Sequence, residues 1–292
     1  MSRIEKALEK ARQMRAAELA TPAEAVRAET PAPAPRPISP VQETAAACSR
    51  TVSIKGSNPM LATINDPHSP ISEQYRKLKS TLVRMTNEDR FRNLLMVASA
   101  VSGEGKSMSA INLAISMAQE FDLTVLLIDA DLRRPSIQNY LGLEASAGLS
   151  DCLLDDVDLA DVIVRTDIGK LSIIPAGREV SNPLELFSSK KMQELMADIK
   201  HRYNDRYVII DTPPLLPFAE TRTLGHLMDG IIFVIQEGLV PKASIQEAIE
   251  ALKGCPILGV LLNNSTSFTQ ESHGYGGYYG GYGKRSAEAY KR

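Results

Sequence analysis

The chain has 292 residues, of which 43% are hydrophobic, and a formal net charge of −2 at pH 7. This length allows one large domain or two small ones with a sizeable core, and the near-neutral charge argues against a nucleic-acid partner. The three cysteines, Cys48, Cys152 and Cys255, form no CxxC pair, which excludes a disulfide framework and fits a reducing cytoplasm. The four histidines are scattered without zinc-ligand spacing.

Residues 1–19 are predicted to form an amphipathic helix, because Ile4, Leu8 and Ala11 share one face of a charged segment. The segment lacks the apolar core of a signal peptide, and no apolar run in the chain approaches the roughly 18 to 20 residues that span a bilayer. We therefore expect a soluble cytoplasmic protein that reaches the membrane through a partner. Residues 20–58 are rich in Ala, Pro, Thr and Glu, which predicts a disordered linker.

From residue 59 to residue 269, apolar strand-like runs alternate with helical stretches. The runs cover residues 94–99, 124–129, 170–177, 207–214, 230–235 and 257–264. Near-continuous Val, Ile and Leu strands that are each followed by a helix are typical of a parallel sheet covered on both faces. The sequence therefore predicts an α/β domain with a mostly parallel sheet and helices on both faces.

A phosphate-binding loop follows the first of these strands, in the segment SAVSGEGKS. Its glycines let backbone amides close around phosphate oxygens, and the helix that follows directs its positive end at them. Lys106 is expected to reach the β- and γ-phosphates and Ser107 to hold Mg²⁺. The first glycine of the GxxxxGK[ST] pattern is replaced by Ala100. The residues expected to bind nucleotide here are Ser102, Gly103, Glu104, Gly105, Lys106, Ser107 and Met108.

Acidic residues close two further strands of the predicted sheet. The run LLIDADLRRP carries Asp129 and Asp131, and YVIIDTPP carries Asp211. Alternation places Asp129 and Asp131 on the same side of their strand, at its carboxyl end, where ligands bind in open parallel sheets. Such carboxylates can coordinate Mg²⁺ or accept a proton from an attacking hydroxyl. Together with the loop at 102–108 they predict a Mg-nucleotide site in a P-loop NTPase fold.

Residues 270–292 form a tail that cannot build a core, because glycine separates most of its tyrosines. The tail carries Tyr275, Tyr278, Tyr279, Tyr282 and Tyr290. By itself it indicates either chemistry on tyrosines, a sticky low-complexity end, or a segment that stacks on RNA.

The order of these motifs resembles that of the bacterial tyrosine kinases of exopolysaccharide and capsule systems, the BY-kinases. The resemblance runs from about Glu73 to the C-terminus and covers SAVSGEGKS (Walker A), LLIDADLRRP (Walker A′), VIIDTPP (Walker B) and the terminal tyrosine cluster. The family also lacks the first P-loop glycine. The segment IIPAGREVSNPLELF looks like the family's connecting segment. The N-terminal SRIEKALEKAR and its Ala/Pro linker resemble the tyrosine autokinase subgroup of exosortase-linked loci.

The resemblance implies an ATP- and Mg²⁺-dependent protein tyrosine autokinase that modifies the five tail tyrosines. It implies that Asp129 is the general base or a metal-linked acid, with Asp131 beside it. Asp211 would be a Mg²⁺ acid together with Ser107, and Lys106 would bind phosphate.

Two further pairs of residues have alternative interpretations. Arg133 and Arg134 would lie near the phosphates or a subunit interface, or in a solvated turn. Asn263 and Asn264 would border the adenine, or simply end their strand in a turn.

The resemblance also implies partners. Glu73, Arg76 and Lys79 lie three apart in SEQYRKLKSTL, on one helical face, as in the helix that the family uses to assemble rings; a plain charged surface helix is the alternative. The family usually has Arg at the last position, and Lys79 keeps its charge without its bidentate geometry. The other implied partners are a separate transmembrane activator of the polysaccharide co-polymerase type and a tyrosine phosphatase.

Two other functions are compatible with the nucleotide site. Partitioning and positioning ATPases of the deviant-Walker class carry an extra lysine early in the P-loop, where this chain has Val101, and a tyrosine tail has no purpose in them. A nucleotide-gated scaffold for polysaccharide assembly is the second, and it does not exclude kinase activity.

Overall fold

A computed structural model describes residues 51–54, 58–87, 91–202 and 206–266 of this chain. The expected N-terminal helix, residues 20–50 of the expected linker and the tyrosine-rich tail lie outside these residues, so what the sequence predicts for them stays a prediction. Within the described part, no helix combines the length and the apolar character that crossing a membrane requires.

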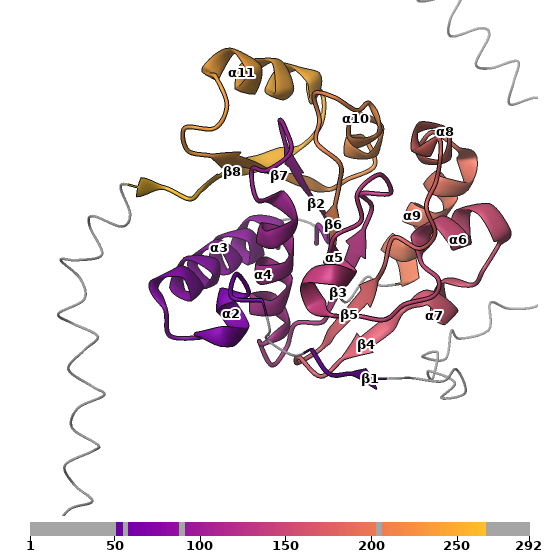
Figure 1. Cartoon of the computed structure of the whole chain (residues 1–292), viewed down its shortest axis with the longest axis horizontal. Coiled ribbons are helices and arrows are strands. Elements are labelled where there is room, and N and C mark those ends of the chain that lie inside the picture. Colours follow the sequence, from indigo (N-terminus) through magenta and orange to yellow (C-terminus); the bar gives the residue numbers. More distant parts are fainter. Residues whose placement is uncertain (1–50, 55–57, 88–90, 203–205, 267–292) are drawn as a thin grey trace, which may run out of the picture. The chain divides into compact units, whose positions relative to one another are not determined.

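The described residues form an eight-stranded sheet with the order β1-β4-β5-β3-β6-β2-β7-β8 (Figure 1). The strands are β1 (Thr51–Val52), β2 (Leu94–Ser99), β3 (Val125–Asp129), β4 (Val164–Thr166), β5 (Leu171–Ile174), β6 (Tyr207–Asp211), β7 (Gly230–Gln236) and β8 (Ile257–Asn263). Neighbouring strands run parallel, except that β4 and β5 are antiparallel. The expected mostly parallel sheet is confirmed.

Helices cover both faces of this sheet (Figure 1). One face carries α2 (Ala62–Asn65), α3 (Pro70–Thr86), α4 (Lys106–Ala118) and α5 (Ile137–Leu141). The other carries α6 (Leu149–Asp155), α7 (Leu159–Val162), α8 (Pro183–Phe187), α9 (Lys190–Arg202), α10 (Glu220–Gly225) and α11 (Lys242–Ala251). Along β2, Leu95 and Val97 pack into the cluster that contains α4, whereas Leu94 and Met96 pack into the opposite one. A strand buried on both faces has no polar alternation, which is why these strands appear as continuous apolar runs.

Two short strands, β1 and β4, form one edge of the sheet and were not expected. Thr51 and Val52, which the sequence placed in the linker, pair with β4, and Ile54 is buried with 6% of its surface exposed. Asp167 fixes this segment by accepting hydrogen bonds from the Ser53 hydroxyl (2.5 Å) and the Ile54 N–H (3.0 Å). The expected linker boundary at residue 58 is therefore wrong, and the folded domain includes residues 51–54. Strands of two and three residues are too short to show a hydrophobic period.

The strand order brings three motifs together at the carboxyl ends of neighbouring central strands. β2, which leads into the phosphate-binding loop, lies between β6 and β7, and β3 lies on the other side of β6. In this register Asp211 of β6 is level with Val97 of β2 and with Asp129 of β3. The carboxyl ends of β2, β3 and β6 therefore meet at the start of α4.

Candidate active site

Two glycines give the phosphate-binding loop its shape. Gly103 and Gly105 have φ angles of 90° and 88°, in the left-handed region that other residues enter only at a cost. A Cβ atom at Gly105 would also lie 2.1 Å from Nδ2 of Asn263. The same Asn263 amide donates a hydrogen bond to the backbone carbonyl of Glu104 (3.0 Å). The structure thus brings Asn263 to the loop, whereas its expected contact with adenine stays a prediction.

Ala100 at the first position of the loop fits for a different reason. It is fully buried, it is absent from the positive-φ residues, and its carbonyl accepts a hydrogen bond from the Leu216 N–H (3.0 Å). Its backbone therefore does not need glycine. The buried Glu104 side chain closes the loop by accepting the Val101 N–H at 2.8 Å. This internal role of Glu104 was not predicted from the sequence.

Helix α4 begins at Lys106, directly after Gly105. The Ser109 N–H donates to the Gly105 carbonyl at 2.8 Å, which is an i to i−4 bond of the first turn. The amides that precede it, those of Lys106 to Met108, have no acceptor within a helix of this geometry and carry the positive end of its dipole. The loop and the first turn of α4 therefore offer a set of N–H groups suited to phosphate.

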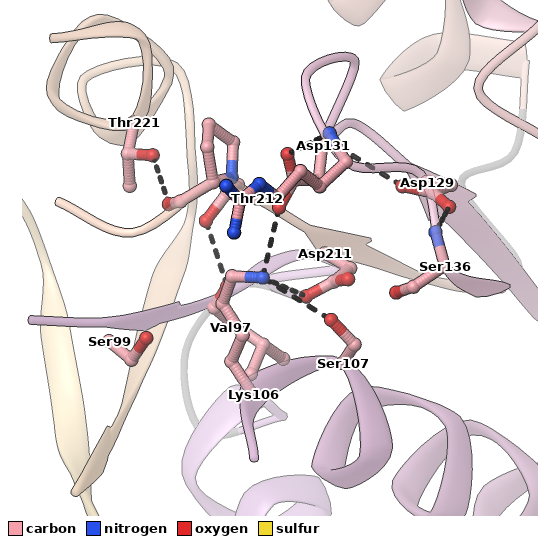
Figure 2. Close-up of polar contacts among 12 residues, drawn as sticks. Val97, Ser99, Lys106, Ser107, Asp129, Asp131, Ser136, Asp211, Thr212 and Thr221 are labelled. Carbon is pink, nitrogen blue, oxygen red and sulfur yellow. Dashed lines mark hydrogen bonds and ion pairs between the residues drawn. The ribbon is translucent and has the colours of Figure 1, made fainter. Parts of the chain in front are cut away.

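Lys106 lies among the acids at the ends of β3 and β6, as Figure 2 shows. Its Nζ atom is 3.1 Å from Oδ2 of Asp131, 3.9 Å from Oδ1 of Asp211 and 3.3 Å from the Ser107 hydroxyl. Burial alone would lower the pKa of Lys106, but the charges of Asp211 and Asp131 outweigh it and the pKa is raised. Lys106 is therefore a fixed cation in this site.

Asp211 is fully buried, and neither of its carboxylate oxygens accepts a hydrogen bond from the part of the chain that the structure describes. Burial raises its pKa to about 7, against the opposing effect of the Lys106 charge. A buried carboxylate without hydrogen bonds needs a cation. With the Ser107 hydroxyl and the Asp131 carboxylate nearby, the donors are oxygens, which Mg²⁺ prefers.

The oxygens present fit Mg²⁺ but do not enclose it. Among the described residues, no group of three or more His, Cys, Asp or Glu side chains is arranged to hold a metal ion. Mg²⁺ is usually bound by one or two carboxylates together with substrate phosphates and water. The arrangement therefore suits Mg²⁺ that arrives with a nucleotide.

Asp129 and Asp131 do not face the same way, contrary to the expectation from alternation. The Asp129 carboxylate accepts three backbone N–H groups, those of Asp131 (3.1 Å), Ser136 (3.0 Å) and Ile137 (3.0 Å). Asp131 instead faces Lys106 (Figure 2). The reason is that β3 ends at Asp129, so the two-residue period of a strand does not extend to Asp131.

Comparison of the sequence and the structure with known proteins shows the family to which this chain belongs. The AAA domain family matches residues 93–254. The tyrosine-protein kinase YwqD of Bacillus subtilis is 37% identical over 216 residues, which are 73% of this chain and 90% of YwqD. The kinase domain of the Escherichia coli tyrosine kinase ETK superposes with a TM-score of 0.66 at 29% identity, covering 72% of this chain and 81% of that one. The chain belongs to the bacterial tyrosine kinase family.

Two further similarities delimit this assignment. ExoP of Rhizobium meliloti, a succinoglycan biosynthesis transport protein, is 31% identical over 69% of this kinase, which corresponds to 26% of ExoP. The septum site-determining protein MinD of Pyrococcus horikoshii, solved with Mg-ADP, superposes with a TM-score of 0.51 at 23% identity over 60% of the kinase and 71% of MinD. This second likeness shows the shared fold only, so the kinase assignment is favoured over a positioning ATPase.

Arg133 of the kinase contacts neighbours that the sequence did not indicate. Its guanidinium group donates to Glu220 at the start of α10 (2.6 Å and 2.8 Å) and lies 4.4 Å from the ring centre of Phe218. Glu220 is 1% exposed. Nothing in the spacing of Glu220 singles it out in the sequence, and its role appears only once the loops after β3 and β6 are adjacent. The Arg134 side chain is exposed, and its N–H donates to Asp131 Oδ1 at 3.1 Å.

The expected interface residues lie on α3 and are paired within the chain. Arg76 bonds to Glu73 and to the carbonyl of Pro67, and Lys79 pairs with Glu120, which follows α4. A cavity of about 440 Å³ adjoins Arg76, Lys79 and Glu120 and is also lined by Phe121, whose exposed fraction is 87%. The role of these residues in assembly stays a prediction.

Proposed function

We propose that this chain is an ATP-dependent protein tyrosine autokinase that phosphorylates the C-terminal tyrosines of a neighbouring copy. The observation that supports it best is Asp211, a fully buried carboxylate that has no hydrogen-bond partner among the described residues and lies beside Lys106 and Ser107, in a chain that is 37% identical to a tyrosine-protein kinase. The tail supplies the phenol groups, and its glycines allow several of them to reach one site.

The residues at the carboxyl ends of β2, β3 and β6 have separate roles in this proposal. Backbone amides from Ser102 to Met108 surround the phosphates, and Lys106 exchanges its contact with Asp131 for the β- and γ-phosphates. Ser107 and Asp211 hold Mg²⁺, which when bound neutralises phosphate charge. Asn263 lies at the nucleotide side of the loop.

Transfer needs a base, because the ordinary pKa of tyrosine is about 10. A carboxylate at the end of β3, Asp129 or its neighbour Asp131, accepts the phenol proton as the phenol oxygen forms a bond to the γ-phosphorus. The bond between that phosphorus and the β–γ bridging oxygen breaks, and ADP leaves with the electron pair.

We place this activity in exopolysaccharide production. The similarity to a succinoglycan biosynthesis transport protein supports this. In this proposal the chain assembles into a ring through Glu73, Arg76 and Lys79, and a separate membrane protein of the polysaccharide co-polymerase type recruits and activates it. A tyrosine phosphatase reverses the modification. Membership of the exosortase-linked subgroup is part of the same proposal.

Antibody detection of phosphotyrosine after incubation with Mg·ATP tests the activity. Wild type should be labelled, while Lys106→Met and a chain lacking residues 270–292 should not. Lys253→Met is the matched control, because Lys253 is exposed and its salt bridge is with the exposed Glu250, three residues earlier; it should be labelled like wild type. Wild type that stays unlabelled even with an activator fragment present would refute the proposal.

Mass spectrometry of the labelled tail identifies the acceptors. We expect phosphate on Tyr275, Tyr278, Tyr279 and Tyr282, and less on Tyr290, where the glycine spacing is lost. Phosphate confined to tyrosines of the folded domain would contradict the tail as substrate.

A further inference from the structure

The last described residues of the chain lie beside the phosphate-binding loop. Strand β8 is parallel to β7, which is parallel to β2, so the carboxyl ends of all three strands lie on the side where that loop begins. β8 is also the outermost strand of the described sheet next to β7 (Figure 1). Asn263 ends β8, and its side-chain amide donates to the Glu104 carbonyl of the loop (3.0 Å). The tail that follows therefore starts close to the nucleotide site.

Glu237, in the loop after β7, holds the chain directly after β8. Asn264 has a φ angle of 54°, in the left-handed region that asparagine enters more readily than most residues. Beyond this turn, the Glu237 carboxylate accepts the Thr266 N–H at 2.6 Å and the Thr266 hydroxyl at 3.3 Å. The Glu237 N–H donates to the Asn263 carbonyl at 3.1 Å. One residue thus holds both sides of the turn, and we call this arrangement the tail clamp.

The tail clamp joins the start of the tail to the phosphate-binding loop. Bonds from the Thr266 N–H and the Ser265 side chain hold the pKa of Glu237 below its ordinary value, so its carboxylate stays charged and binds N–H more strongly than a neutral acceptor would. The same loop carries Leu239, whose Cδ2 atom would lie 3.9 Å from a Cβ atom at Gly103. The clamp therefore gives the tail a fixed starting point next to the site that transfers phosphate.

The reach of each tail tyrosine is measured from this starting point. An extended chain spans at most about 3.3–3.6 Å per residue, so Tyr275 lies within about 30 Å of Thr266 and Tyr290 within about 85 Å. The start of a tether matters most to the acceptor on the shortest tether. We infer that Glu237 is a positioning residue, which fixes the start of the acceptor tail and thereby favours phosphorylation of Tyr275 over tyrosines further along. The inference rests on the proposed phosphorylation of the tail.

Glu237→Ala in the full chain removes the clamp, and because Glu237 is exposed the domain should stay folded. Amide hydrogen exchange at Thr266 should become at least about fivefold faster than in wild type. After a short incubation with Mg·ATP, mass spectrometry should show a ratio of phosphate on Tyr275 to phosphate on Tyr282 that is at least about threefold lower. The KM for Mg·ATP should stay as in wild type, and Glu237→Gln, which keeps one acceptor oxygen, should restore part of the ratio.

Glu247→Ala is the matched control, since Glu247 is an exposed acid on α11; its exchange at Thr266 and its phosphate ratio should match wild type. A free acceptor then separates tethering from catalysis. A peptide of residues 270–292, isotopically labelled to distinguish it from the attached tail, reaches the site without the clamp. Glu237→Ala should phosphorylate this peptide at the wild-type rate. A lower rate would show that Glu237 acts on the nucleotide site and would overturn the inference.

Two other results would overturn it. Exchange at Thr266 that is unchanged in Glu237→Ala would show that the clamp does not hold the chain. Faster exchange with an unchanged ratio of Tyr275 to Tyr282 phosphate would show that the clamp holds the chain without directing the tail. Failure of the proposed function looks different from both, because wild type itself would then carry no phosphate on its tail.

Discussion

At the scale of single residues, the site contains a buried acid that costs stability in the free protein. Neither oxygen of the buried Asp211 carboxylate has a hydrogen-bond partner among the described residues, and the charge of Lys106 and the nearby Ser107 hydroxyl offset only part of the cost of burial. Such groups are retained where a ligand needs them, since binding removes the cost that folding incurs. The acid is therefore expected to lower the stability of the free protein and to be required for nucleotide binding.

The pH dependence of Asp211→Asn tests this cost. Burial raises the pKa of Asp211 from 3.8 to about 7 in the folded protein, so folding favours the protonated form. The wild type should therefore lose stability as the pH rises from about 4 to about 7. Without nucleotide, Asp211→Asn should be more stable than wild type at pH 8 by about 1–3 kcal/mol, and this advantage should vanish near pH 4.

Urea unfolding at a series of pH values measures the difference. The exposed acid Asp122 provides the control, because Asp122→Asn should change stability little at any pH. A difference between Asp211→Asn and wild type that stays constant from pH 4 to pH 8 would contradict the assignment. Calorimetry with Mg·ADP should show that Asp211→Asn has lost binding.

Gly105→Ala should damage the loop in two ways. Its φ of 88° disfavours any side chain, and the new Cβ would lie 2.1 Å from the Asn263 amide. We expect Mg·ADP affinity to fall at least about tenfold, because Gly105 lies in the phosphate-binding loop, where strain of about 1–2 kcal/mol and the clash with Asn263 displace the amides that bind phosphate. Gly238→Ala is the matched control, since its φ is 75° but nothing lies within 4 Å of the new atom; calorimetry should show near-normal affinity for it.

At the scale of elements, the site depends on two loops that meet. The loop after β3 carries Asp131, and the segment after β6 carries Glu220. Arg133 joins them, because it bonds to the buried Glu220 and stacks on Phe218. The pair therefore couples the Walker A′ loop to the start of α10.

Arg133→Ala should destabilise the domain by about 1–3 kcal/mol, because it leaves the Glu220 carboxylate buried and unpaired. Arg134→Ala is the control, since the Arg134 side chain is exposed and only its backbone N–H, which alanine retains, bonds to Asp131. Thermal or urea unfolding of the two variants provides the comparison. Equal stabilities of the two variants would show that the contact with Glu220 contributes nothing.

Elements were predicted well where hydrophobic runs are long. β2 was placed at its observed bounds, and β3, β7 and β8 within one residue at either end. The runs expected at 170–177 and 207–214 form shorter strands, because β5 ends at Ile174 and β6 at Asp211. β1 and β4 were missed, because their residues become strands only by pairing with each other and, for β4, with β5.

At the scale of the whole molecule, the proposed kinase joins a catalytic domain to its own substrate. Glu73, Arg76 and Lys79 lie on α3, and Arg76 and Lys79 line the cavity that also contains the exposed Phe121. The ion pair between Lys79 and Glu120 would have to rearrange if Lys79 bonds to another copy. Assembly and tail chemistry are then linked, because a neighbouring copy must deliver the tyrosine.

Phosphorylation is expected to loosen the assembly. Each phosphate adds about −1.5 to −2 charges, so several on one tail repel one another and the acids of the site. Light scattering after size exclusion should show a smaller mean mass after incubation with Mg·ATP than before it. A chain without residues 270–292 should keep its mass under both conditions, and a fully phosphorylated wild type with an unchanged mass would contradict the expectation.

The sequence by itself determined the fold class, the phosphate-binding loop and the three acids, because a buried parallel sheet needs continuous apolar strands and phosphate needs glycines before a helix. The tertiary structure alone decided which groups each acid contacts. Asp129 and Asp131 are two residues apart, yet one bonds to its own backbone and the other to Lys106, since the strand that would have aligned them ends between them. The tertiary structure also decided the partner of Arg133. Its contact with Glu220 joins residues 87 apart in the sequence and forms only because the ends of β3 and β6 are neighbours.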